Sequence, residues 1–275
     1  MRRERHIVAI ALLVSATILL FGCQTEEDAG EQQAAVDTEE WAWLQSTHET
    51  LLARRAELKK LNRLANGLEL PEGETAPEEW AELSAEEIGQ KASELEQEIY
   101  SMVDEYVPRL TEFINNQGMV VGAEPTEIQK QALRMNSAEA MAVADEFIEK
   151  GGDYNRAIDI YNQALGSDPD NEILQAAVAS AEEMRFMSED RFAQVKNKMT
   201  ETDVRNALGP VNLRNIKDYP DRGVKAWFYR KADGGAAAVW FRQRKNSEEW
   251  EVYKTNFEEI KQQVVGGETE EEEVS

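Results

Sequence analysis

Apolar residues recur every three or four positions between residues 39 and 117, a spacing that predicts amphipathic helices. The first helix is expected to begin near Asp37 or Thr38, since either residue can cap a helix, and to end at about Asn66–Gly67. The positions predicted to share one face of this helix are Trp41, Leu44, His48, Leu51, Leu58, Leu61, Ala65 and Leu68.

A second helix is expected from Pro77, because proline favours the first position of a helix. Its apolar positions alternate steps of four and three, which is typical of a helical hairpin or a short coiled coil. Pro108 lies inside this pattern and predicts a kink there or a break near Val107. The seam consists of Ile88, Ala92, Leu95, Ile99, Met102 and Tyr106.

Helical spacing continues through residues 124–187, with a third helix expected from Glu124–Pro125. Residues 138–171 then carry Met141, Ala144, Ile148, Gly152, Tyr154, Ala157, Tyr161, Ala164 and Pro169. This spacing resembles one tetratricopeptide repeat, a unit of ~34 residues. The resemblance implies two helices joined by a turn at Gly151–Asp153, with Tyr154 and Tyr161 in a groove that could hold a partner. Because a single unit cannot bury its own faces, the next helix is expected to cap it.

From residue 188 to 256 the pattern changes to two short helices followed by alternating strands. The strands are expected at Val224–Lys231, Ala236–Arg244 and Trp250–Tyr253, with a hairpin turn at Asp233–Gly235. The predicted fold is therefore mainly α, with helical hairpins, followed by a small α+β domain with a three- or four-stranded antiparallel sheet. A short helix and an acidic disordered tail are expected over residues 257–275.

One set of positions in the C-terminal module follows a known family pattern: Val195, Met199, Thr200, Val204, Leu208, Gly209, Pro210, Tyr229, Val239 and Phe241. With these residues, the module resembles the SmpA/OmlA (BamE-like) family of small lipoproteins. Two positions depart from the family pattern: Lys198 replaces the usual glycine and Val211 replaces a common proline. The resemblance implies a two-helix, three-strand fold and a lipoprotein setting; the outer-membrane member belongs to the β-barrel assembly machinery. Related folds also serve as protease or lactamase inhibitors, so the fold alone does not decide the function.

The N-terminal residues have the pattern of a signal peptide. An apolar run over residues 7–20 follows three arginines, and it is shorter than the ~20 residues that a membrane-spanning helix needs. The run ends in Leu20-Phe21-Gly22-Cys23, which resembles the lipobox of bacterial lipoproteins. That resemblance implies cleavage after residue 22, lipid on Cys23, and a disordered spacer over residues 23–38. The same resemblance implies that Gln24, in the place after the lipid-bearing cysteine, directs the protein to the outer membrane, facing the periplasm. The alternatives are a secreted soluble protein and a short signal anchor.

Charge separates the C-terminal module from the rest of the chain. The chain has 30 basic and 54 acidic residues and a net charge of −24, which argues against nucleic acid as a partner. Residues 23–187 contain 12 basic and 36 acidic residues, whereas residues 188–256 contain 14 basic and 10 acidic ones. This step indicates a domain boundary and a different kind of partner for the C-terminal module.

Residues able to carry catalysis or bind a metal are scarce. After residue 22 the chain has one histidine, His48, and it has no Gly-x-Ser-x-Gly motif. Cys/His metal sites lack ligands, and no cofactor is expected. The sequence favours a non-enzymatic envelope scaffold that binds protein partners through its helical region and its C-terminal domain. The alternative is an inhibitor or a peptidoglycan-associated module, and a hydrolase with an unrecognised site ranks third.

The predicted sheet supplies a candidate interaction surface. Strand alternation places Trp227 and Tyr229 on one face and puts the neighbours Trp240 and Phe241 on opposite faces. An aromatic face beside Arg242 and Arg244 would suit a protein or an anionic glycan. The alternative is that helices cover this face.

Overall fold

The computed structural model describes residues 38–118, 124–244, 247 and 249–260. The predicted signal peptide, the lipid attachment at Cys23 and the spacer up to residue 37 lie outside this part of the chain. Residues 261–275, which include the predicted acidic tail, lie outside it as well. The fold is mainly helical and ends in a small antiparallel α+β domain, so the predicted fold class is confirmed.

The described chain divides into two compact units. Unit 1 takes its residues from Met1–Val143 and Asn162–Leu174, and unit 2 from Ala144–Tyr161 and Gln175–Ser275. The division passes through three helices that were predicted to form one tetratricopeptide-like region.

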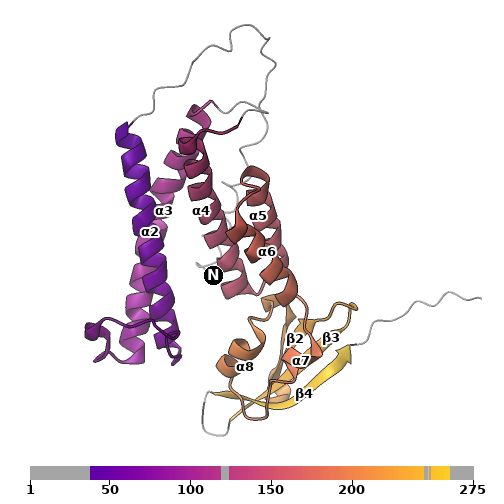
Figure 1. The fold of residues 1–275 in the computed structure, drawn as a ribbon. Helices are drawn as coiled ribbons and strands as arrows, with labels where there is room; N and C mark the ends of the chain where they lie inside the picture. Colours follow the sequence, from indigo (N-terminus) through magenta and orange to yellow (C-terminus); the bar gives the residue numbers. More distant parts are fainter. Residues whose placement is uncertain (1–37, 119–123, 245–246, 248, 261–275) are drawn as a thin grey trace, which may run out of the picture. The chain divides into compact units, whose positions relative to one another are not determined.

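Unit 1 is built around a helical hairpin of α2 (Thr38–Ala65) and α3 (Ala85–Asn116), which lie side by side (Figure 1). The start of α2 meets the end of α3, where Trp41 stacks on Phe113 with ring centroids 4.9 Å apart, so the helices are antiparallel. The predicted seam forms the core of this hairpin, with Met102 partly buried. The buried members are Ile88, Ala92, Leu95, Ile99 and Tyr106.

The second helix differs from its prediction at two points. It begins at Ala85 rather than at Pro77, because Ser84 and Glu87 form a capping box there. Pro77 instead precedes the short 3₁₀ helix η1 (Glu78–Trp80). The break expected near Val107 is absent: α3 continues through Pro108, with apolar residues buried on both sides of it.

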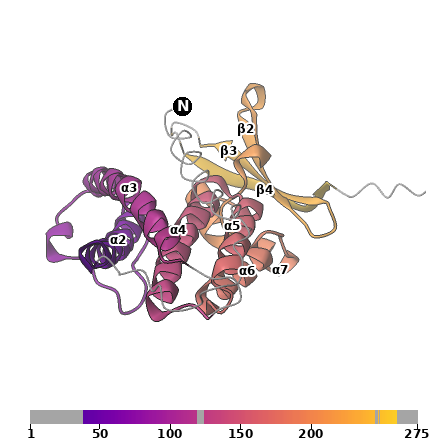
Figure 2. The same cartoon turned by 90° about the horizontal axis from the view of Figure 1, so that it is seen from above.

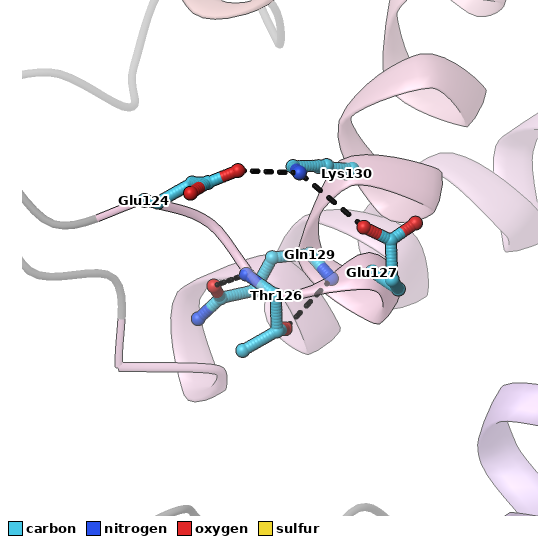
Figure 3. A network of polar contacts seen from close by, with 5 residues as sticks. All are labelled: Glu124, Thr126, Glu127, Gln129 and Lys130. Carbon is cyan, nitrogen blue, oxygen red and sulfur yellow. Dashed lines mark hydrogen bonds and ion pairs between the residues drawn. The ribbon is translucent and has the colours of Figure 1, made fainter.

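Helix α4 (Glu127–Gly151) begins at a second capping box, shown in Figure 3. The Thr126 hydroxyl accepts the Gln129 N–H at 3.3 Å, and the Gln129 side-chain oxygen accepts the Thr126 N–H at 2.7 Å. The separate helix expected ahead of residue 138 is therefore the first half of one continuous helix. Ala132 and Met135 in this half join the core of unit 1.

The second half of α4 and α5 (Tyr154–Ser167) form the predicted helix–turn–helix, and α6 (Glu172–Met184) is the helix expected after it. The turn between α4 and α5 lies at residues 152–153, within the predicted turn, and Gly152 adopts a φ of +59°. That conformation favours glycine, because other residues pay a steric penalty from Cβ.

Unit 2 contains α7 (Glu189–Phe192), α8 (Glu201–Leu208) and a four-stranded antiparallel sheet in the order β1-β2-β3-β4. Ser188 caps α7, and Thr200 with Asp203 forms the predicted capping box of α8. Figure 2 labels the three longer strands. The strand bounds are Ile216–Tyr219, Val224–Arg230, Ala236–Gln243 and Trp250–Ile260.

One face of the sheet carries the core of unit 2. Trp227, Tyr229 and Phe241 pack there with apolar residues of the two short helices, among them Phe192 and Val204. Two elements differ from the prediction. The short strand β1 was not expected, and β4 continues to residue 260 where a short helix was expected from residue 257. The helix prediction was wrong for residues 257–260 because β4 pairs with β3 up to Ile260, which lies opposite Ala236, the first residue of β3.

Candidate binding site

Unit 2 contains a cleft with a volume of about 230 Å³. Its lining comes from four segments that are distant in the sequence, within residues 152–155, 184–187, 208–215 and 228–230. The first segment is the turn between α4 and α5, and the last is the end of β2. The cleft thus depends on the packing of the helical turn onto the α+β module within unit 2.

Two glycines allow this packing. A Cβ atom on Gly152 would lie 2.4 Å from the backbone carbon and oxygen of Val211, so only glycine fits the contact. A Cβ atom on Gly209 would lie 2.7 Å from the hydroxyl oxygen of Tyr154, and Gly209 has a φ of +82°. Tyr154, which follows the helical turn, therefore packs closely against the stretch Leu208-Gly209-Pro210 of the C-terminal module.

Arg191 fixes the segment of the cleft that follows α6. Its Nη2 donates hydrogen bonds to the carbonyl oxygens of Met184 at 3.1 Å and Phe186 at 2.7 Å. The backbone N–H of Met187 donates to the carbonyl of Arg230 at 2.7 Å, which ties the segment to β2. Arg191 is consequently a positioning residue rather than a ligand-binding one.

Three further arginines, Arg185, Arg214 and Arg230, line the cleft. Within the described residues, none of their guanidinium groups forms an ion pair. The Nε atom of Arg185 is buried without a hydrogen-bond partner in this part of the chain, and its Cζ lies 4.7 Å from the ring centroid of Phe186. Asp153 also lines the cleft, but its Oδ1 accepts the backbone N–H of Arg156 at 3.2 Å and so caps α5.

Two tyrosines complete the wall of the cleft, and both stay protonated. Burial raises the pKa of the Tyr154 hydroxyl, although the charges of Arg191 and Arg205 act in the opposite direction. Burial also raises the pKa of Tyr229, whose hydroxyl donates to the carbonyl of Gly209 at 3.5 Å. These hydroxyl groups can donate hydrogen bonds, and their raised pKa values make them poor nucleophiles near neutral pH.

Of the candidate surface residues, the aromatic ones lie in the interior. Trp227 and Tyr229 are buried in the core of unit 2, where Trp227 packs against Phe241 at 4.7 Å between ring centroids. Tyr161 is also buried, and its hydroxyl donates to the carboxylate of Asp145. Tyr154 is half-buried against Gly209. The prediction that these residues form an accessible surface is therefore wrong for the three buried ones, and Tyr154 lines the cleft instead.

Arg242 and Arg244 are exposed, as predicted. Arg242 lies over the ring of Tyr253, with 5.5 Å from Cζ to the centroid, and Arg244 pairs with Glu249 at 3.3 Å and with Glu251 at 3.5 Å. Both side chains thus have partners on their own sheet. Neither of them lines the cleft.

The aromatic face expected on the sheet is formed by other residues. Trp240 is half-buried and stacks on Tyr219 at 5.5 Å, and Phe228 meets it edge-on at 6.2 Å between centroids. Phe228 also lines the cleft, so this aromatic group continues from the cleft wall. Strand alternation predicted that Trp240 and Phe241 lie on opposite faces of the sheet. This part of the prediction is confirmed, because Phe241 belongs to the core of unit 2 and Trp240 does not.

Sequence reasoning missed the three cleft arginines. No motif marks them, because they come from three separate segments that only the folded chain brings together. The available signal was the charge step near residue 188, which showed a basic module without showing its basic site.

The lone histidine lies in the hairpin of unit 1. Its ring stacks on Tyr106 at 6.2 Å between centroids, and its Nδ1 is buried without a partner among the described residues. Burial lowers the pKa of His48, and the charge of Glu139 offsets part of this effect. His48 is thus a packing residue in the described structure.

The described residues contain no cluster of three or more His, Cys, Asp or Glu side chains suited to a metal ion. Among the described helices, none combines the length and the apolar character needed to cross a membrane. Comparison of the chain with protein-family profiles, curated proteins and solved structures gave no match.

Proposed function

We propose that this chain is a lipid-anchored, non-catalytic scaffold of the bacterial envelope, and that the cleft of unit 2 binds an acidic segment of a partner protein. The observation that carries the proposal is the group formed by Arg185, Arg214 and Arg230. These three arginines line one cleft of a protein whose net charge is −24, and their guanidinium groups form no ion pair within the described residues.

The chemistry of arginine favours a carboxylate ligand. A guanidinium group presents a planar fork of N–H donors that matches a carboxylate in two parallel hydrogen bonds. A cleft lined by one sign of charge focuses its potential and attracts the opposite charge. Phe186 and Phe228 add apolar surface beside the cations, and Tyr154 adds a protonated hydroxyl. A peptide that carries several carboxylates fits this combination.

The proposed anchor is the lipid on Cys23, in the outer membrane and facing the periplasm. The motif at residues 20–23 supports it from the sequence alone. The backbone at Lys198 supports the resemblance that implies a lipoprotein setting. Lys198 has a φ of 72°, the positive value that favours the glycine usual in the family at this position. Mass spectrometry of the protein from membranes should find an acylated N-terminus at Cys23, and an unmodified thiol would refute the anchor.

The second candidate is a peptidoglycan-associated module or an inhibitor. The same arginines favour it to a lesser degree, because cell-wall stem peptides also carry carboxylates. The two candidates differ in the polymer that the cleft arginines hold.

The test is a titration of the full-length chain in detergent with a fluorescein-labelled hexaglutamate peptide, followed by fluorescence anisotropy. The R214Q/R230Q variant should bind about tenfold more weakly than the wild type, because two charge-assisted contacts are lost at a partly solvated site. The matched control is R222Q/R242Q, which removes two exposed arginines outside the cleft and should bind as the wild type does. Equal binding by both variants would refute the acidic-segment site.

Sedimentation with purified cell wall distinguishes the second candidate. Wall binding that is saturable and lost in R214Q/R230Q, without hexaglutamate binding by the wild type, would favour the peptidoglycan module over the scaffold.

A further inference from the structure

We infer that the acidic run Glu268–Glu273 of this chain docks into the arginine cleft of unit 2 when no partner occupies it. The inference rests on the proposed function, because it makes the chain's own carboxylates competitors of the partner's. It assigns the cleft one particular occupant from within the molecule.

The position at which strand β4 ends supports docking of the acidic run. Strand β4 ends at Ile260, which pairs with Ala236, the first residue of β3. Ala236 pairs in turn with Arg230, the last residue of β2 and one of the cleft arginines. Two strand spacings thus separate the end of β4 from Arg230, a distance of about 10 Å between Cα atoms. The chain leaves the described sheet beside the cleft.

Chain length and charge agree with this path. Eight residues lead from Ile260 to Glu268, and they span up to about 28 Å when extended, more than the distance to Arg230 requires. The run contains five glutamates: Glu268, Glu270, Glu271, Glu272 and Glu273. The cleft offers three arginines against one carboxylate, Asp153, which already caps a helix. The two charge patterns are complementary.

Tethering makes the intramolecular complex the favoured one. A segment joined to its site by a short linker acts at an effective concentration in the millimolar range. A second copy of the chain at micromolar concentration cannot match this value. Docking within one molecule is therefore expected, and self-association is the competing outcome.

Zero-length cross-linking tests the position of the run directly. In the full-length R230K variant, position 230 keeps its charge and gains an amine, which a water-soluble carbodiimide joins to a carboxylate in contact. The matched variant is R222K, because Arg222 is exposed just before the opposite end of β2. The ion pair of Lys225 with Glu201, at 2.9 Å, serves as the internal standard in both variants.

The expected result is a monomeric product in which residue 230 is joined to a glutamate between 268 and 273, with little such product at residue 222. The inference is overturned if the standard forms but the link from 230 is absent, if both positions react equally, or if only dimers carry the link. This result does not depend on any partner, so it is informative even if the proposed function fails.

Competition gives the second measurement. Changing the five glutamates of the run to glutamine should raise the affinity for labelled hexaglutamate about tenfold. The control changes five exposed glutamates of unit 1 to glutamine, and it measures the effect of net charge alone: Glu69, Glu72, Glu78, Glu79 and Glu82. An equal gain in both variants would refute docking. Hexaglutamate binding by the wild type with no gain in the first variant would refute docking and leave the proposed function intact.

Discussion

Arg55 and Arg109 of unit 1 and the cleft arginines of unit 2 are used in opposite ways. In unit 1, Arg55 holds Glu139 through two hydrogen bonds of 2.8 and 2.6 Å, and Arg109 holds Glu40 in the same bidentate manner while lying 3.5 Å above the ring of Trp43. In unit 2, the arginines of the cleft have no such carboxylate in the described residues. Paired arginines position helices, whereas unpaired arginines grouped at a cleft are available to a ligand.

Arg55 and Arg109 of unit 1 thus contribute to stability, and the cleft arginines of unit 2 contribute to binding. Substitutions in unit 1 and at the glycine contacts of unit 2 are expected to change the free energy of unfolding, and substitutions of the cleft arginines are expected to change ligand affinity alone.

The largest effect is expected from Gly152→Ala. The new Cβ would clash with the backbone of Val211 and would occupy a left-handed conformation, so unit 2 should lose roughly 3 kcal/mol or more of stability. Hydrogen exchange of β2 and β3 amides measures the loss. Gly151→Ala is the control, because its Cβ would meet only ordinary contact at 3.9 Å, and an equal loss in both variants would contradict the account.

The next effect is expected from Arg55→Met. The side chain of Glu139 is 7% exposed, and its carboxylate would lose a bidentate partner, which should cost unit 1 about 2–3 kcal/mol. Denaturant unfolding measures the change. Arg54→Met removes the neighbouring, more exposed arginine and should cost less than about 1 kcal/mol. Similar costs for the two variants would show that the buried pair has no special role.

A smaller gain is expected from Lys198→Gly. Glycine adopts positive φ without a Cβ penalty, so the variant should be more stable by about 0.5–1 kcal/mol. Thermal unfolding measures the shift. Lys196→Gly, two residues earlier and without positive φ, should not raise the melting temperature, and a matching rise there would contradict strain at Lys198.

The smallest effect is expected from His48→Leu, and it concerns how the stability of unit 1 depends on pH. Burial lowers the pKa of His48, so the unfolded chain binds a proton more readily than the folded chain does. The stabilisation is therefore present above the ordinary pKa of about 6.5 and is lost as the pH falls below it. His48→Leu should unfold with a shallower pH dependence between about pH 7 and 5.5. An unchanged slope would show that His48 does not contribute.

Local signals in the sequence predicted much of the fold. The heptad seam identified the core of α3, and Ser188 and Thr200 marked the starts of α7 and α8. The start of the second helix was missed because Pro77 was preferred to the Ser84 capping box, a signal that was also present in the sequence. Continuity through Pro108 depends on packing, which outweighs the local preference of proline.

The site could not be predicted in the same way. Its arginines come from the residue after α6, from the 3₁₀ helix Leu213–Asn215 and from the end of β2, and packing at Gly152 and Gly209 brings these segments together. The aromatic residues drew attention because alternation reveals a face of a sheet. Alternation does not reveal whether that face is covered, and for Trp227 and Tyr229 it is.

The most direct test of the central claim measures hexaglutamate affinity for R214Q/R230Q and Arg55→Met side by side in the full-length chain. R214Q/R230Q is expected to bind about tenfold more weakly at wild-type stability, whereas Arg55→Met is expected to unfold more easily and, while folded, to bind as the wild type does. Equal affinities in the two variants, or a loss of affinity in Arg55→Met alone, would contradict the central claim.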